Sequence, residues 1–294
     1  MDLARLVNRF RIDKPERFRL SKHDPGDTAD LDIDKKEAKD LLAEGTARLS
    51  DLQERLYAQD RWAMLAIFQA MDAAGKDSAI KHVMSGVNPQ GCDVHSFKRP
   101  SDEEEDHDFL WRSSRRLPER GRIGIFNRSY YEEVLVVRVH KEVLEREKLP
   151  TSLVGKDIWR KRFKDIRAHE RYLARNGLAI VKFFLHLSKD EQRRRFLERL
   201  DTPSKNWKFS SADVTERKLW DQYMRAYEDM IRHTSRGEAP WYVVPADNKW
   251  FTRIAVAAAM VATLERLDLK FPSVTGAAAA ELEKARKMLL RERN

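Results

Sequence analysis

Two hydrophobic patterns alternate along this chain of 294 residues. Short apolar runs are typical of buried strands, and apolar residues three or four positions apart are typical of amphipathic helices. The runs predict strands at 62–68, 92–97, 122–126, 178–187 and 241–244. The helical spacing predicts helices at 32–57, 79–84, 101–117, 131–140, 156–176, 188–200, 212–233, 248–267 and 281–291. This alternation predicts an α/β fold, with a mainly parallel sheet covered by helices on both faces.

The pattern favours one domain over residues 1–294, since no linker or internal repeat divides it. Residues 1–30 are polar and basic and contain Pro15, Pro25 and Gly26, so we expect an extended N-terminal arm. Residues 189–233 combine helices with a polar loop, and this arrangement is typical of a mobile lid over a phosphotransferase site.

The segment after the first predicted strand has the layout of a phosphate-binding loop. Backbone N–H groups at a helix N-terminus bind phosphate there, and Lys76 adds a positive charge. The match to G-x-x-x-x-G-K-[ST] is incomplete, because Ala70 and Asp77 replace the first glycine and the hydroxyl residue. An ordinary strand-to-helix turn with a surface lysine is the alternative. The expected phosphate-binding residues are Ala73, Ala74, Gly75, Lys76, Asp77 and Ser78.

Asp72 points to a metal ion beside this loop. A carboxylate at the end of a buried strand costs free energy unless it is solvated, paired or bound to a metal. Next to a phosphate-binding lysine it indicates Mg²⁺. We therefore expect Mg²⁺ as the cofactor and Asp72 as its ligand, or as a group that orients the acceptor phosphate.

Two further strand ends belong to the same edge of the predicted sheet. In open α/β sheets, ligands bind beyond the carboxyl ends of the strands. This rule selects Lys98 after the second strand, and Asn127 and Arg128 after the third. Asn127 stands where a Walker B aspartate commonly lies, and Arg128 could clamp phosphate bidentately. A salt bridge from Arg128 to Glu132 or Glu133 is the alternative.

A second basic cluster lies in the predicted lid. Arg193 is expected to project from the apolar side of the helix at 188–200, and Arg194 follows it. Lys205 and Lys208 flank Trp207 in the loop, so these four cations are candidate phosphate ligands. A solvated basic face is the alternative for any single arginine. An aromatic residue among lysines also fits single-stranded nucleic acid, but we expect no such partner, because no strand carries the aromatic pattern of an RNA-binding domain.

The composition of the chain limits the classes of molecule that it is expected to bind. The formal net charge is +9, which favours an anionic partner such as a phosphorylated metabolite or a polyanion. Cys92 is the one cysteine, so the chain cannot form an intrachain disulfide. Because Cys92 starts a strand-like run, we expect a structural thiol. The N-terminus lacks a secretory signal, and the longest apolar stretch is too short to span a bilayer. We therefore expect a cytoplasmic protein with no membrane contact.

Several co-linear motifs resemble the polyphosphate kinase 2 family, and the resemblance covers about residues 10–268. It is carried by MDAAGKD (71–77), SGVNPQG (85–91), SFK (96–98), DHDFLWR (106–112), FNRSYYEEVLVVRVH (126–140), KNWKF (205–209) and shorter strings at 226–228, 239–241 and 249–250. Members of this family move a terminal phosphoryl group between inorganic polyphosphate and a nucleotide, with magnesium.

The resemblance implies a P-loop-kinase-like fold with a helical lid and a homo-oligomeric state. It assigns Asp72, Gly75 and Lys76 to the Walker A part, and Asn127 and Arg128 to the Walker B part. Many members carry aspartate where this chain has Asn127, so a metal-ligand role at this position is not implied. The Asn-Arg-Ser-Tyr-Tyr-Glu form resembles the branch that accepts both AMP and ADP, so adenine or other purine nucleotides are the expected partners.

Two other functions are compatible with the residues alone. An ATP-dependent kinase on the same scaffold would phosphorylate a small molecule or a nucleotide and would not use polyphosphate. A basic nucleic-acid-binding protein would bind oligonucleotides without turnover, and loss of Lys76 would remove only about one charge contact.

Overall fold

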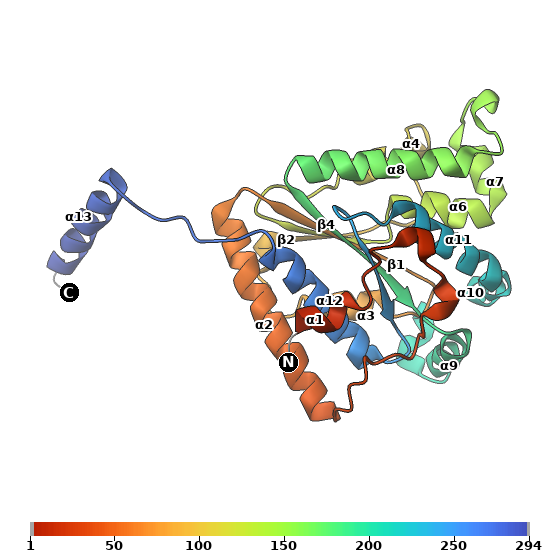
Figure 1. The fold of residues 1–294 in the computed structure, drawn as a ribbon, viewed down its shortest axis with the longest axis horizontal. Coiled ribbons are helices and arrows are strands. Elements are labelled where there is room, and N and C mark those ends of the chain that lie inside the picture. Colours follow the sequence, from red (N-terminus) through yellow and green to blue (C-terminus); the bar gives the residue numbers. More distant parts are fainter. Residues whose placement is uncertain (1–2, 293–294) are drawn as a thin grey trace.

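The computed structural model describes residues 3–292, without the side chains of Leu3, Ala4 and Lys208. Within this range five parallel strands form one sheet in the order β2-β3-β1-β4-β5 (Figure 1). Their bounds are β1 (Ala63–Ala70), β2 (Cys92–Ser96), β3 (Ile123–Asn127), β4 (Leu178–His186) and β5 (Trp241–Pro245). The predicted α/β fold with a parallel sheet is confirmed.

One face of the sheet is covered by α1 (Leu3–Asn8), α2 (Lys35–Gln59), α3 (Lys76–Val83) and α12 (Lys249–Glu265). Buried alanines fill much of α12, so this helix can approach β4 and β5 closely. Because α3 follows β1 directly, its N-terminus is fixed at the carboxyl edge of the central strand.

The other face is covered by α8 (Ile158–Arg175), α11 (Trp220–Thr234), α6 (Val136–Val139) and the 3₁₀ turn η4 (Tyr130–Val134). An aromatic and aliphatic stripe on α11 faces the core, and its buried members include Trp220, Tyr223, Tyr227 and Ile231. The parallel strands carry apolar residues on both faces because helices exclude water from each side.

The remaining described helices are short or peripheral. They are α4 (Asp102–Glu105), α5 (Trp111–Ser114), α7 (Lys141–Leu144), α9 (Lys189–Leu200), α10 (Ser211–Glu216) and α13 (Ala277–Arg291). The other 3₁₀ turns are η1 (Pro15–Arg17), η2 (Leu20–Lys22), η3 (Pro89–Gly91), η5 (Glu145–Glu147), η6 (Thr151–Leu153), η7 (Pro203–Lys208) and η8 (Arg217–Leu219).

Three predicted helices are interrupted. The helix expected at 101–117 is α4 and α5, because the Asp108 carboxylate accepts the Leu110 N–H (2.9 Å) and competes with helical bonding. The helix expected at 212–233 is divided into α10 and α11 by η8, and the one at 131–140 into η4 and α6. Ser101 and Glu104 form a capping box at the start of α4.

The N-terminal arm is more ordered than predicted. It begins with α1, and Val7, Phe10 and Phe18 are buried. The backbone of Phe10 accepts the Val243 N–H (2.9 Å), so the arm covers the outer edge of β5. The expectation of a merely extended arm is therefore wrong, because its apolar side chains complete the core.

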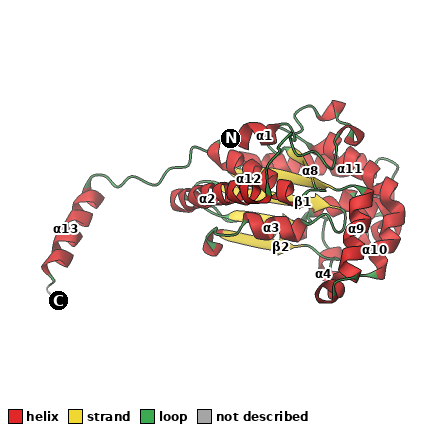
Figure 2. Cartoon of the chain, turned by 90° about the horizontal axis from the view of Figure 1, so that it is seen from below, coloured by secondary structure: helices red, strands yellow, loops and turns green. Residues whose placement is uncertain are grey.

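Figure 2 shows α13 at the end of an extended segment, away from the sheet and its covering helices. Among residues 3–292, none of the helices has the length and apolar character needed to cross a bilayer.

Candidate active site

The loop between β1 and α3 has the backbone shape that phosphate binding requires. Ala73 and Gly75 adopt left-handed conformations, with φ of 64° and 98°. Gly75 is the N-cap of α3, where a side chain would be strained. The first N–H groups of a helix have no intrahelical partner, so those that open α3 are available to an anion at the carboxyl edge of the sheet.

Helix α9 fixes this loop from the side through a buried arginine. The Arg195 guanidinium donates to the carbonyls of Ala73 and Ala74 (3.0 Å each), and also to those of Ala246 (2.6 Å) and Asp247 (3.1 Å). Its Nε pairs with the Glu191 carboxylate at 2.7 Å. Every nitrogen of this guanidinium is thus bound within the protein, and Arg195 acts as a strut between two loops.

Lys76 is the first residue of α3, at the end of this loop. Its ammonium group donates to the carbonyl of Ala70 (3.1 Å), which bends the side chain back over the end of β1. Burial lowers the pKa of Lys76, as does the nearby charge of Arg128, whereas the Asp72 carboxylate acts in the opposite direction.

The ends of β1 and β3 exchange side-chain contacts. Arg128 Nη2 lies 3.3 Å from Asp72 Oδ1, and both side chains are partly exposed. The Asn127 amide donates to the Asp77 carboxylate at 2.7 Å. The alternative partners considered for Arg128, Glu132 and Glu133, make no ion pair with it among the described contacts. The polar groups that precede and begin α3 are therefore tied to the neighbouring strand.

These residues line a cleft of about 710 Å³ that is rich in cations. We call it the cationic cleft, and it contains eight Lys or Arg side chains against four Asp or Glu side chains. It brings together the predicted residues Asp72, Ala73, Ala74, Gly75, Lys76, Asp77, Ser78, Lys98, Asn127, Arg128 and Lys205. It adds four cations that the sequence did not single out, Arg195, Arg199, Lys249 and Arg253.

Two of the predicted lid cations do not line the cationic cleft. Arg193 and Arg194 are exposed, and Arg194 pairs with Glu191 at 2.5 Å. The prediction that Arg193 projects from the apolar side of its helix is wrong, because Arg195 occupies the buried face. The side chain of Lys208, a third predicted cation, lies outside the part that the structure describes.

A sequence signal for two of the missed cations existed. Lys249 and Arg253 are four residues apart on the helix that follows β5. The strand-end rule that selected β1, β2 and β3 applies equally to β5. Arg195 and Arg199 carry the same i, i+4 spacing on α9, next to Phe196 on the buried face.

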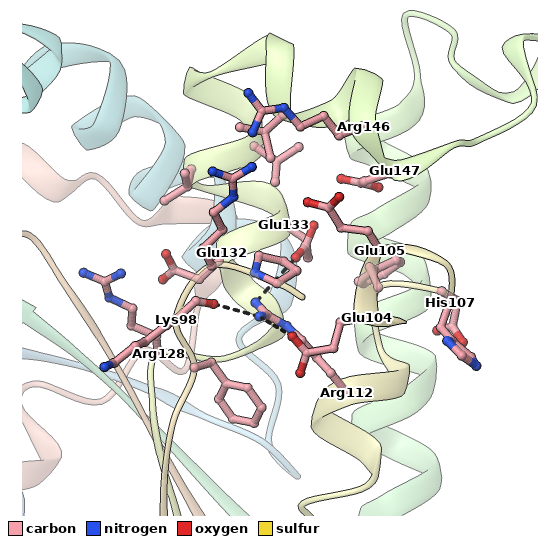
Figure 3. A pocket seen from close by; sticks show the side chains of 18 residues that line it. Lys98, Glu104, Glu105, His107, Arg112, Arg128, Glu132, Glu133, Arg146 and Glu147 are labelled. Atoms are coloured by element: carbon pink, nitrogen blue, oxygen red, sulfur yellow. Dashed lines mark hydrogen bonds and ion pairs between the residues drawn. The ribbon is translucent and has the colours of Figure 1, made fainter. Parts of the chain in front are cut away.

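A second cavity, of about 290 Å³, meets the cationic cleft at Phe97, Lys98 and Arg128. Figure 3 shows Lys98 and Arg128 on one side of it, opposite Glu104 and His107. A third cavity, of about 330 Å³, shares Asp72 and Arg128 with the cleft. Arg128 therefore borders all three cavities.

A buried ionic cluster adjoins the second cavity, which Arg112, Glu133 and Glu147 help to line. Arg112 donates to the Lys98 carbonyl (2.8 Å), and Arg162 donates to the Glu133 carbonyl (2.9 Å). Burial and the nearby Glu147 carboxylate raise the pKa of Glu133, against the influence of Arg162 and Arg112. This cluster fixes the backbone of Lys98 and the first turn after Arg128.

The cleft suits a metal ion that is shared with a ligand. The described residues contain no group of three or more His, Cys, Asp or Glu side chains that could enclose a metal by themselves. Mg²⁺ is commonly held by one or two carboxylates together with waters and substrate phosphates. The partly exposed carboxylate of Asp72 fits that mode.

Comparisons with known proteins agree with this geometry. Residues 32–272 match the sequence model described as polyphosphate kinase 2. The chain is 54% identical to an ADP-polyphosphate phosphotransferase of Rhodopseudomonas palustris, covering 97% of this chain and 99% of the relative. It is 46% identical to an AMP/ADP-polyphosphate phosphotransferase of Meiothermus ruber, covering 90% and 96%. It superposes on the crystal structure of polyphosphate kinase 2 from Arthrobacter aurescens with a TM-score of 0.88 and 39% identity, covering 97% and 96%.

Proposed function

The chain belongs to the polyphosphate kinase 2 family, and we propose that it moves a terminal phosphoryl group between inorganic polyphosphate and the nucleotides AMP and ADP. The names of its relatives, one specifying ADP and one specifying AMP and ADP, support this reaction. The observation that carries the proposal is the position of Arg128, which borders both the cationic cleft and the two smaller cavities. Two phosphorylated substrates can meet at that guanidinium.

Polyphosphate is the substrate that fits the cationic cleft. Its repeated negative charges match a long lining of Lys and Arg side chains, of which Lys205, Lys249 and Arg253 lie beyond the phosphate loop. An ordinary nucleotide kinase needs fewer cations at this place. Binding through partly exposed cations weakens as salt is added, because counter-ions screen the charges.

The nucleoside of the acceptor fits the second cavity. Phe97, Phe109 and Val136 give it an apolar wall, and Lys98 and Arg128 stand at the side that opens to the cleft (Figure 3). A base could pack against the apolar wall while the phosphates extend toward Arg128. This orientation directs the terminal phosphate of AMP or ADP to the phosphate loop.

Phosphoryl transfer needs positioning and charge stabilisation more than covalent help from the protein. Lys76 and the first amides of α3 would hold the transferred group, and Arg128 would bind the phosphate on the other side. Asp72 and waters would hold Mg²⁺, which neutralises charge on phosphate oxygens when it is bound. Asn127 would orient the Asp77 carboxylate that it contacts.

We also propose that the protein acts in the cytoplasm, where its nucleotide substrates are found, and as a homo-oligomer. Purine nucleotides other than those of adenine are expected acceptors, since the second cavity is lined largely by apolar and charged side chains rather than by a set of neutral hydrogen-bonding groups.

Turnover tests the proposal directly. The purified chain is mixed with polyphosphate and Mg²⁺, with AMP in one reaction and ADP in another, and products are separated by chromatography. We expect ATP from both, and no product after chelation of the metal. ATP from ADP alone would remove AMP from the acceptors. Absence of product from a folded sample in both reactions would favour the ATP-dependent kinase instead.

A further inference from the structure

The phosphate loop is fastened to α9 through three successive carbonyl groups. Arg195 donates to the carbonyls of Ala73 and Ala74. Gln192, which lies one turn earlier on the buried side of the same helix, donates from Nε2 to the carbonyl of Asp72 (2.9 Å). Only 1% of the surface of Gln192 is exposed. Its amide therefore holds the backbone of the residue that is expected to bind Mg²⁺.

These contacts decide which way the peptide groups of the loop face. None of the described peptide bonds is cis, and in a trans peptide the N–H points opposite to the preceding carbonyl. Because the three carbonyls point to α9, the N–H groups of Ala73, Ala74 and Gly75 point away from it. The N–H of Ala74 closes a turn onto the Met71 carbonyl (3.2 Å). Those of Ala73 and Gly75 have no partner among the described contacts, so they are available to an anion.

The other end of the Gln192 amide is fixed by an arginine of the predicted lid. Its Oε1 accepts from Nη1 of Arg217 (3.1 Å), and the same nitrogen donates to the carbonyl of Lys189. An amide has an acceptor at one end and donors at the other, so an oxygen held by an arginine turns the NH₂ group to the opposite side. Arg217 therefore sets which end of the amide faces the Asp72 carbonyl.

Arg217 lies at the junction of α10 and α11. It opens η8, and the residue before it is Glu216, the last residue of α10. Glu216 accepts from the Tyr223 hydroxyl (2.7 Å) and lies 3.0 Å from Nε2 of His140. All three of these residues line the third cavity. The junction thus contacts this cavity through one residue and the support of the phosphate loop through the next.

From these contacts we propose that Gln192 is a positioning residue that couples the lid to the phosphate loop. Arg217 orients its amide, and the amide holds the Asp72 peptide in the direction that leaves the neighbouring N–H groups open to phosphate. Gln192 is not among the described residues that line the cationic cleft or the two cavities adjoining it, so it acts through the backbone. The inference rests on the proposed function only where it concerns turnover, because anion binding is measured separately.

Anion binding by the full chain tests the support of the loop. Isothermal titration calorimetry with inorganic tripolyphosphate, first in EDTA and then in Mg²⁺, gives the dissociation constant of each variant. Gln192→Met should raise this constant by about tenfold in both conditions, because the Asp72 peptide loses the donor that holds it. Gln222→Met, the same change at an exposed position of α11, is the matched control and should bind as wild type does.

The part played by Arg217 is tested in the same assay. Arg217→Met should raise the dissociation constant by about threefold, because the amide of Gln192 is then free to turn its oxygen toward Asp72. Lys218→Met removes the same charge from the next, exposed residue and should leave binding unchanged. The double variant Gln192→Met/Arg217→Met should bind no more weakly than Gln192→Met alone, because both residues act through one amide. Arg217→Lys keeps a donor and should recover part of the loss.

Turnover gives a further readout that separates this inference from the proposed function. In Gln192→Met we expect kcat to fall by about tenfold while the KM for nucleotide stays near that of wild type. If wild type binds tripolyphosphate but forms no product, the proposed function fails and the binding results still decide the coupling. The coupling is overturned if Gln192→Met, shown by urea unfolding to be folded, binds as wild type does, or if the two single effects add in the double variant. Should Gln192→Met not fold, equal binding by Arg217→Met and Lys218→Met would overturn it.

Discussion

Lys182 and Lys76 are two lysines with opposite surroundings, one within the sheet and one at the start of α3. Lys182 lies in β4 and is fully buried. Its ammonium group donates to the Glu170 carboxylate (2.6 Å), the Tyr131 hydroxyl (2.8 Å) and the Thr234 carbonyl (3.0 Å). An ammonium group has three donors, so all are used within the protein.

Lys76 has a single bond of this kind among the described contacts, to the carbonyl of Ala70. Burial lowers the pKa of both lysines, but Lys76 keeps part of its surface exposed whereas Lys182 keeps none. The two lysines also differ in the number of acceptors that the fold supplies. A cation with a full set of partners holds the structure, and one with donors to spare can bind a phosphate.

The arginines repeat this contrast. The buried Arg195 guanidinium donates hydrogen bonds to four carbonyls and to the Glu191 carboxylate. Arg128 makes one long contact with Asp72 and keeps 42% of its side-chain surface exposed. Both line the cationic cleft, so proximity to the cleft alone does not identify a ligand.

The largest expected effect is on turnover by Lys76→Met. We expect the rate to fall by about 10³-fold, because a charge aimed at the transferred phosphoryl group is lost. The free energy of unfolding should change by less than about 1 kcal/mol, since a single hydrogen bond is removed. Lys81→Met, an exposed lysine on the same helix, is the control for charge. A similar loss of rate in both variants would contradict the assignment.

The same substitution at Lys182 should give the opposite result. Lys182→Met leaves Glu170 buried without its counter-charge, which costs about 3–4 kcal/mol of unfolding free energy. Activity per folded molecule should stay near wild type. Urea unfolding measures the first quantity, and turnover at low temperature measures the second. Glu170→Gln in the same chain should recover part of the stability, and a failure to recover any would place the loss elsewhere.

His186 extends the comparison to a buried imidazole, whose Nε2 lies 3.1 Å from the carbonyl oxygen of His23. Burial lowers the pKa of His186 to about 4. The unfolded chain binds this proton near pH 6.5. The free energy of unfolding should therefore fall as the pH drops from about 6.5 to 4, by up to about 3 kcal/mol. His186→Gln should flatten this part of the curve of unfolding free energy against pH. If the curve is unchanged in the variant, groups other than His186 cause the dependence of unfolding free energy on pH.

Arg195→Lys should cost about 2 kcal/mol of stability, because an ammonium group cannot reach two pairs of carbonyls as the planar guanidinium does. The phosphate loop would lose its support, so turnover should fall as well, with the Michaelis constant for nucleotide rising. Arg194→Lys is the matched neighbour, since its side chain is exposed. Equal behaviour of the two variants in thermal unfolding and kinetics would argue against the strut.

Cys92 should show the smallest effect. Burial and the charge of Asp93 raise the pKa of its thiol to about 11, so little thiolate exists at neutral pH. We expect slow alkylation by iodoacetamide in the folded protein, measured by mass spectrometry. Cys92→Ser should retain full turnover and lose less than about 1 kcal/mol of stability. Fast alkylation together with loss of turnover would contradict a structural role.

The sequence predicted the parts of this fold that depend on local pattern. The five strands and the long helices follow from apolar periodicity, and Asp72, Lys76 and Arg128 follow from the rule about strand ends. The interruptions of three helices were not visible, since they depend on local side-chain bonds such as that of Asp108. Among Arg193, Arg194 and Arg195 the choice was wrong, because the buried face of α9 is set by distant carbonyls at 73–74 and 246–247. No local pattern contains that information.

The strut formed by Arg195 also has a consequence for how the protein is made. It joins the loop at Ala73 to the turn at Asp247, and these segments leave the ribosome far apart in time. The phosphate loop therefore cannot take its final shape until most of the chain has been synthesised. A nascent chain that already exposes Lys76 would still lack an ordered site. The last third of translation thus decides when this protein first becomes able to bind its substrates.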